Sequence, residues 1–266
     1  MVTTHVDQAR DRVAAEREAV VAKRSAIDEF VDRIEGISAE SSTSPSPLAG
    51  GAVRAGASGV LARGSTSADD GCAAVRSAFA ETVRPHSVAD HEEDEPLLET
   101  IRSELSDSIA VALAPTTDTS LSPELKQLIV SEASNRRAEA TVFVRALDRE
   151  ADQLTTAASV VDEITGWIVE TDERPLGDLG FDALAERHQT LAAHRDRCEA
   201  LAADRQAFLQ ASTSEGADLG VSHDQLPSYC YAAFPIDHPV LVTAARLDDV
   251  CAECQRAVRA HLTRRG

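Results

Sequence analysis

Apolar residues recur at helical spacing along much of the chain, and the first stretch is the most regular. Its β-branched residues stand seven positions apart: Val6, Val13, Val20, Ile27 and Ile34. A repeat of 3.5 residues puts these side chains on one line of a helix, where they need the cover of a second helix. The pattern predicts an N-terminal heptad helix over residues 1–36 that packs against another helix, in the same chain or in a second copy.

The longest predicted helix begins with Ser122 as N-cap and Pro123 at the first helical position, and it extends to about Thr171. Its apolar positions alternate steps of three and four, as in a coiled-coil seam. They are Val144, Leu147, Ala151, Leu154, Ala158, Val161, Thr165 and Ile168.

A return helix is predicted from Phe181 to about Ala211, and its seam mixes apolar with polar residues. The seam consists of Leu184, Arg187, Leu191, His194, Cys198, Leu201, Arg205 and Phe208. Two helices joined by a short loop pack antiparallel. We therefore expect a long helical hairpin whose polar seam residues face acids of the first helix: Asp148, Glu150, Asp152 or Asp162.

The remaining segments complete a four-part organisation. Residues 37–68 are rich in Ser, Gly and Pro, which predicts a flexible linker. Residues 69–114 are expected to hold short helices around an acidic loop at 90–95, with one helix from Pro96 to Leu113. Residues 115–266 form the hairpin and a C-terminal helix that starts near Pro239.

Composition supports an all-α fold. Hydrophobic residues make up 43% of the chain but aromatic residues only 3%, so the core must be built from Ala, Val, Leu and Ile. Side chains of this size suit closely packed helices. The prediction is an all-α coiled-coil bundle with a linker after its first helix.

The net charge of −19 bears on partners and surroundings, since 45 acids face 26 bases and only Lys23 and Lys126 are lysines. One interpretation is repulsion of nucleic acid and anionic membranes, or attraction of a basic partner. The other is adaptation to a salt-rich cytosol, where charges are screened beyond ~3 Å at ~1 M salt. Without an apolar leader or a run of ~20 apolar residues, we expect a cytoplasmic protein that binds neither membrane nor nucleic acid.

Two cysteines three residues apart raise the question of a metal or redox site. Cys251 and Cys254 fall on the apolar stripe of the last helix, which predicts core packing. That stripe is Val240, Ala244, Leu247, Cys251, Cys254, Val258 and His261. The alternative is a metal or redox site that also uses Cys230 and His238. We expect no metal and no cofactor.

Tyr229, Tyr231 and Phe234 form the other candidate site, because three of nine aromatic residues fall within six positions between prolines. They could anchor a protein partner, or they could cap the helical hairpin from inside; the second interpretation is favoured. No motif of nucleophilic, phosphate-binding or metalloprotease chemistry occurs in the chain. The sequence thus predicts a non-enzymatic interaction or scaffold protein, with a cysteine-based sensor or a module for a basic partner as alternatives.

Several segments resemble an uncharacterised haloarchaeal family of helical proteins, a domain of unknown function. They are HVDQARDRVAAEREAVVAKRSAIDEF, CAAVRSAFAETV, ALDREADQL, RCEALAADRQ and YCYAAFPIDHPVLVTAARL. The resemblance implies a helical fold and a cytoplasmic haloarchaeal origin. It implies no activity, cofactor or catalytic residue.

Overall fold

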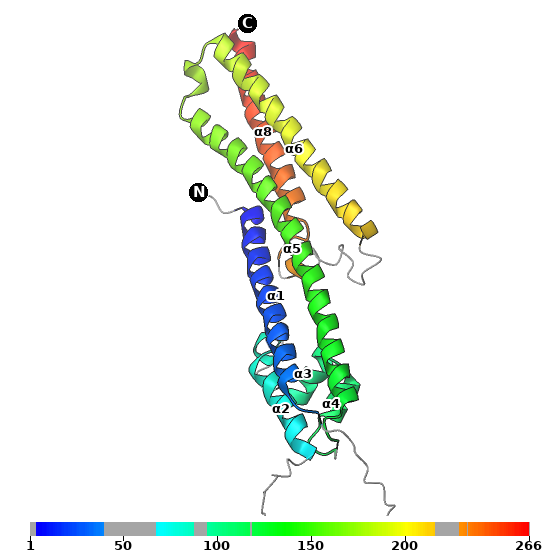
Figure 1. Cartoon of the computed structure of the whole chain (residues 1–266). Helices are drawn as coiled ribbons and strands as arrows, with labels where there is room; N and C mark the ends of the chain where they lie inside the picture. The colour runs from blue at the N-terminus through cyan, green and yellow to red at the C-terminus, as the bar shows by residue number, and fades with distance from the viewer. Residues whose placement is uncertain are drawn as a thin grey trace, which may run out of the picture. The chain divides into compact units, whose positions relative to one another are not determined.

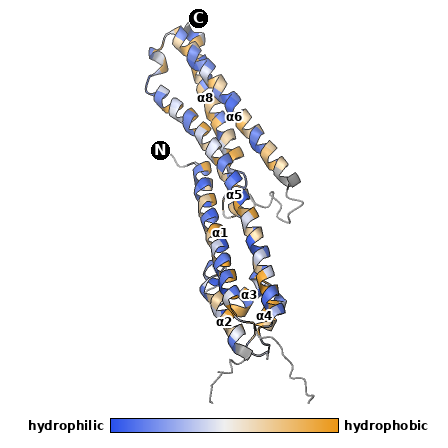
Figure 2. Ribbon diagram, in the orientation of Figure 1, coloured by the Kyte–Doolittle hydropathy of each residue, from blue (hydrophilic) through white to orange (hydrophobic). Residues whose placement is uncertain are grey.

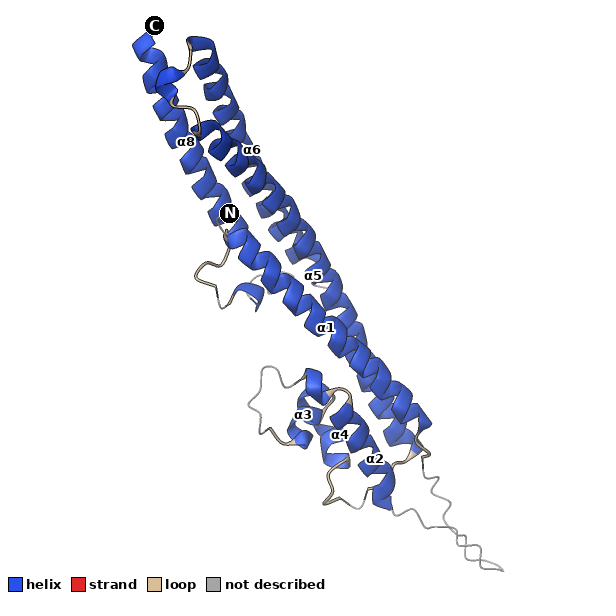
Figure 3. Cartoon of the chain, turned by 90° about the vertical axis from the view of Figure 1, so that its left-hand side faces the viewer, coloured by secondary structure: helices blue, strands red, loops and turns tan. Residues whose placement is uncertain are grey.

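A computed structural model describes residues 4–39, 68–87, 95–117, 119–215, 229–232 and 234–265. Within these ranges the chain forms helices and no strand, which confirms the predicted all-α class (Figures 1 and 3). The α-helices are α1 (His5–Gly36), α2 (Ala68–Glu81), α3 (Leu97–Glu104), α4 (Asp107–Ala112), α5 (Pro123–Asp172), α6 (Phe181–Glu215) and α8 (Pro239–Arg265). Two 3-10 turns are η1 (Arg84–His86) and η3 (Leu176–Asp178). Most of the predicted linker and the acidic loop lies outside the described residues.

The chain divides into two compact units, and both divisions fall inside long helices. Unit 1 comprises residues 1–18 and 143–266, whereas unit 2 is the continuous stretch 19–142. The divisions thus differ from the predicted segments 1–36, 37–68, 69–114 and 115–266. The physical reason is that α1 and α5 each contribute one part to unit 1 and the other part to unit 2. Changes in composition along the sequence therefore do not mark the boundaries of the units.

The first turns of α1 and α5 are fixed by capping. The main-chain amide of Asp7 donates to the Thr4 hydroxyl at 3.2 Å, and the Thr4 amide donates to the Asp7 carboxylate at 2.9 Å, which closes a reciprocal cap at the start of α1. These bonds to Thr4 lower the pKa of Asp7. The Ser122 hydroxyl accepts from the amide of Leu125 at 3.2 Å, and Pro123 is the first residue of α5, as predicted.

Unit 2 has its own core, formed by the second half of α1, by α2, α3 and α4, and by the first turns of α5. Phe30 of α1 packs edge-to-face on Phe79 of α2, with 5.6 Å between ring centroids. Lys126 of α5 donates to the carbonyls of Glu35 and Ile37 at 2.8 and 2.7 Å, which satisfies the carboxyl end of α1. This core therefore joins both ends of the unit's sequence.

The region predicted as one helix from Pro96 to Leu113 is two helices, α3 and α4, and that prediction is wrong. The backbone leaves the helix at Leu105, and the following Ser106 is extended. The Ser106 hydroxyl accepts from the amide of Ile109 at 3.3 Å and starts α4 as its N-cap. The serine competes with the helix for backbone partners, and the break aims Ile101 and Ile109 into the same core.

Unit 1 is built from the second half of α5 with α6, α8 and the first turns of α1. Apolar and polar positions alternate along each helix (Figure 2), and many of the apolar residues are buried. α6 and α8 lie side by side (Figures 1 and 3). Their common core with α5 consists of Val161, Ile164, Leu184, Leu191, Cys198, Leu247, Cys251 and Val258.

The predicted seam of α1 is buried within the described chain. Val6, Val13, Ile27 and Ile34 have at most 3% of their surface exposed, and Val20 is half-buried. The first two contribute to unit 1 and the others to unit 2. This chain's own residues therefore cover the line of β-branched side chains.

Candidate functional site

The most enclosed polar residues of unit 1 are an ion pair between α5 and α6. Arg205 donates to both oxygens of Glu150, at 2.8 and 2.7 Å, and the two side chains are 3% and 1% exposed. Such a two-point pair fixes both the register and the rotation of the helices. Glu150 is one of the four acids that the sequence offered to a seam arginine, and the buried guanidinium also stacks on Phe208.

Tyr231 completes this buried network from the turn at 229–232. Its hydroxyl donates to Glu150 at 2.5 Å, and its ring packs edge-to-face on Phe234. Burial, together with the Glu150 carboxylate, raises the pKa of Tyr231, so the hydroxyl keeps the proton that it donates. Glu150, Arg205 and Tyr231 therefore connect α5, α6 and the turn that leads toward α8.

Tyr229, the third of the candidate aromatic residues, lies nearer the surface. It is 46% exposed, its hydroxyl donates to Glu16 of α1 at 2.7 Å, and its ring contacts Phe143 of α5. Tyr229 and Tyr231 thus contact helices of the same chain, and Phe234 packs on Tyr231. Tyr231 is closed to any partner because only 1% of it is exposed.

The four candidate metal ligands occupy different places. Cys230 is buried beside Glu16 and Glu150, and burial raises the pKa of its thiol to about 12. His238 is exposed at the start of α8. Cys251 is buried on the stripe of α8 with Cys254 one turn further on. In the described ranges, no group of three or more His, Cys, Asp or Glu side chains is arranged to hold a metal ion.

Cys251 has a partner that the sequence analysis did not single out. The thiol of Cys198 on α6 lies close enough to raise the pKa of the Cys251 thiol, and Cys251 in turn lowers the pKa of Cys198. The signal was available, since Cys198 stands on the seam of the return helix and Cys251 on the stripe of the last helix. Matching these two seams against each other would have brought the two thiols together.

The other seam residues of α6 are satisfied differently. Arg187 donates to the carbonyl of Thr171 at 2.7 Å, and its pKa is lowered by burial. His194 lies against the Trp167 ring, 4.9 Å between centroids, and neither ring nitrogen has a hydrogen-bond partner among the described residues. Burial lowers the pKa of His194, so the neutral ring is favoured there.

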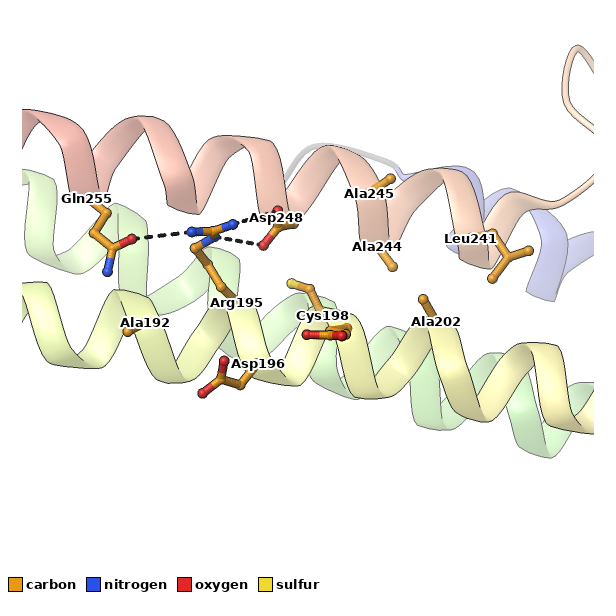
Figure 4. A pocket seen from close by; sticks show the side chains of 11 residues that line it. Ala192, Arg195, Asp196, Cys198, Ala202, Leu241, Ala244, Ala245, Asp248 and Gln255 are labelled. Atoms are coloured by element: carbon orange, nitrogen blue, oxygen red, sulfur yellow. Dashed lines mark hydrogen bonds and ion pairs between the residues drawn. The ribbon is translucent and has the colours of Figure 1, made fainter.

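A groove of about 400 Å³ runs between α6 and α8 (Figure 4). Arg195 crosses it and donates to Asp248 at 2.9 Å, and a longer bond reaches Gln255 at 3.5 Å. The rest of its lining is mostly small or acidic: Ala192, Asp196, Cys198, Glu199, Ala202, Leu241, Ala244 and Ala245. A smaller cavity of about 130 Å³ is lined by residues of α5, α6 and α8, among them Trp167, Arg187 and Cys254.

The fold and these residues define an all-helical protein whose buried polar groups join one helix to another. Within that class, the chain belongs to the family DUF7260, a domain of unknown function, which matches residues 4–255. This confirms the resemblance to a helical domain of unknown function, whereas the haloarchaeal origin stays a prediction. No curated protein and no solved structure matches the chain. None of the described helices is long and apolar enough to cross a membrane.

Proposed function

We propose that this protein is a non-enzymatic helical interaction protein that receives a basic helical segment of a partner in the groove between α6 and α8. The main support for this proposal is the lining of the groove. Alanines along both of its walls leave room for a third helix to approach closely, which is the geometry of recognition by an amphipathic helix in a groove.

Charge supports a basic occupant. Arg195 is neutralised by Asp248 across the groove, and the lining adds Asp196 and Glu199 without a further base. The whole chain carries −19, so a second copy would bring more negative charge to the same place. The seam of α1, the other surface that the sequence offered to a second copy, is covered by the chain itself.

We further propose that the protein works in a salt-rich cytoplasm. Its excess of 19 acids and its two lysines support this, since carboxylates hold water at a surface in concentrated salt. In such a solution, long-range attraction is screened within a few ångströms. Recognition would then depend on close fit in the groove together with short-range ion pairs at its rim.

A site-specific photo-crosslinker at Ala245 tests the groove. Ala245 is exposed and lines it, and Ala260, also exposed on α8, lies outside the lining and is the matched control. In a lysate of the source cells at native salt, the crosslinker at position 245 should capture a basic helical peptide of a defined partner. Ala245→Trp should then abolish binding of that purified partner, and Ala260→Trp should preserve it.

Equal capture at both positions would contradict the proposal, as would unimpaired binding by Ala245→Trp. Capture of a second copy at position 245 would indicate that the groove serves self-association and not binding of a basic partner.

A further inference from the structure

Cys198 of α6 and Cys251 of α8 face each other inside unit 1. Both belong to the core shared by α5, α6 and α8, and they are 2% and 0% exposed. The two thiols are close enough to shift each other's pKa. On the adjacent helices α6 and α8, a covalent bond between them needs the sulfur atoms to approach to about 2.05 Å.

The two thiols are not equivalent. Cys251 lowers the pKa of Cys198, as do the nearby Arg197 and Arg195, whereas burial and Asp248 raise it. Cys198 and burial both raise the pKa of Cys251. Because a thiolate is the nucleophile in cysteine oxidation, Cys198 is the thiol prepared to react first.

Access is also unequal. Cys198 lines the groove between α6 and α8, and Figure 4 shows its side chain pointing from α6 toward α8. Cys251 is not part of that lining and is fully buried. A small molecule that enters the groove therefore meets the sulfur of Cys198 before that of Cys251.

We propose that Cys198 and Cys251 are a peroxide-sensitive thiol pair that closes into a reversible disulfide between α6 and α8. The Cys198 thiolate attacks one oxygen of hydrogen peroxide, a sulfur–oxygen bond forms, the oxygen–oxygen bond breaks, and the departing hydroxide takes a proton to give water. The Cys251 sulfur then attacks the sulfenic acid, the sulfur–sulfur bond forms, and the hydroxide that leaves Cys198 takes the thiol proton of Cys251. Two thiols lose two electrons and two protons, and one peroxide becomes two waters.

This modification site does not depend on the proposed binding of a helix. It also differs from a sensor built on Cys251 and Cys254. Cys254 is three residues further along α8 and lines the smaller cavity with Trp167 and Arg187, and burial raises the pKa of its thiol.

Peptide mapping of the full chain tests the proposal. Reduced protein is treated with hydrogen peroxide in concentrated KCl, remaining thiols are alkylated, and the digest is analysed without reductant. A peptide joining residues 198 and 251 should appear within one molecule, should vanish after dithiothreitol, and should be accompanied by a higher thermal midpoint of the oxidised protein, because the new bond restricts the unfolded chain.

Variants assign the roles. Cys251→Ser should leave a sulfenic acid at Cys198 that reacts with dimedone, whereas Cys198→Ser should abolish both the label and the crosslink. Cys254→Ser is the matched control and should form the crosslink as the wild type does. Circular dichroism checks the fold of each variant. If a variant does not fold, the peptide map of the wild-type protein decides whether the disulfide forms.

Absence of the 198–251 peptide at full peroxide treatment would overturn the proposal. So would a linkage between Cys251 and Cys254, or one between two molecules.

Discussion

Glu150 is the residue on which three segments of unit 1 converge. It accepts two bonds from Arg205 and one from Tyr231, and all three side chains are at most 3% exposed. Burying two charges costs several kcal/mol of desolvation each, which the pair recovers only through good geometry. The network therefore contributes more to a unique arrangement of the helices than to net stability.

Removing one member of the buried pair should be costly. Arg205→Met leaves the Glu150 carboxylate buried without its cation, and we expect a loss of about 3–5 kcal/mol in the free energy of unfolding, measured by denaturant titration. Glu150→Gln combined with Arg205→Met keeps an acceptor for Tyr231 and removes the charge, so the double variant should be more stable than Arg205→Met alone.

The exposed pair of Arg197 with Glu163 offers the control. The two are bonded at 2.6 and 2.7 Å, but their side chains are 37% and 61% exposed. Arg197→Met should cost far less than Arg205→Met. A comparable loss from both substitutions would show that burial is not what makes the pair of Glu150 with Arg205 important.

His194 gives the fold a dependence on pH. Burial lowers the pKa of His194 from its ordinary value of 6.5, and Arg197 lowers it further, while Glu163 acts in the opposite direction. As the pH falls below 6.5, the unfolded chain binds a proton there before the folded chain does, so stability decreases. At higher pH this contribution disappears, because both states hold a neutral ring.

His194→Phe should therefore flatten the stability profile below about pH 6.5 without loss of stability near neutrality, because neither ring nitrogen makes a hydrogen bond in the described structure. Thermal midpoints measured across this range are the readout. Substitution of the exposed His86 controls for removal of a histidine as such. A variant that is as acid-sensitive as the wild type would assign the effect to other groups.

At the scale of elements, the sequence predicted the long helices well because their signals are local and repeated. The cap at Ser122, the heptads of α1 and the seam of α5 each involve residues a few positions apart, and the structure places these helices within a few residues of the prediction. The break between α3 and α4 was missed because a single N-cap serine, Ser106, overrides an otherwise continuous helical pattern.

The candidate site was harder to predict than the helices. That a seam arginine would meet an acid on the preceding helix followed from the pattern, but the choice of Glu150 depends on the register of two helices. Tyr231 reaches Glu150 across 81 positions and Cys198 meets Cys251 across 53, and no local rule relates such residues. Long-range pairing is decided by packing, and only the three-dimensional structure shows it.

Two glycines on helices should respond in opposite ways to the same substitution. A Cβ at Gly71 of α2 would lie 2.9 Å from the Cβ of Leu121, a residue that is 1% exposed, whereas a Cβ at Gly166 of α5 would meet nothing within 4 Å. Gly71→Ala should destabilise by about 1–3 kcal/mol through overpacking. Gly166→Ala should stabilise by about 0.5–1 kcal/mol, because alanine loses less backbone freedom in a helix.

Each glycine variant is the control for the other, and chemical denaturation of both measures the difference. Stabilisation by Gly71→Ala would mean that α2 and the segment around Leu121 are not in the close contact described here.

At the scale of the whole molecule, the net charge of −19 sets the response to salt. Exposed pairs such as Arg17 with Asp148 and Arg137 with Asp28 weaken when salt screens them. The same screening relieves repulsion among 45 acids that have only 26 bases to balance them. Because the acids exceed the bases by 19, relief of their mutual repulsion should outweigh the weakening of these ion pairs.

We therefore expect the thermal midpoint to rise as KCl is raised from dilute buffer toward saturation. A neutral osmolyte at equal osmolality controls for general dehydration and should give a smaller increase. A midpoint that is flat or falls with KCl would remove the support for a salt-rich cytoplasm, and it would leave attraction of a basic partner as the explanation of the charge.

The division of the chain into an uninterrupted unit 2 and a two-part unit 1 has a consequence for how the protein is made. A ribosome finishes every residue of unit 2 once Val142 has been added, while residues 5–18 still lack the partners that α5, α8 and Tyr229 will provide. Val6 and Val13 precede all of unit 2 in the sequence, so their side chains stay exposed to water until the later part of the chain has been synthesised. Residues 5–18 are thus among the last segments of the molecule to acquire their permanent neighbours.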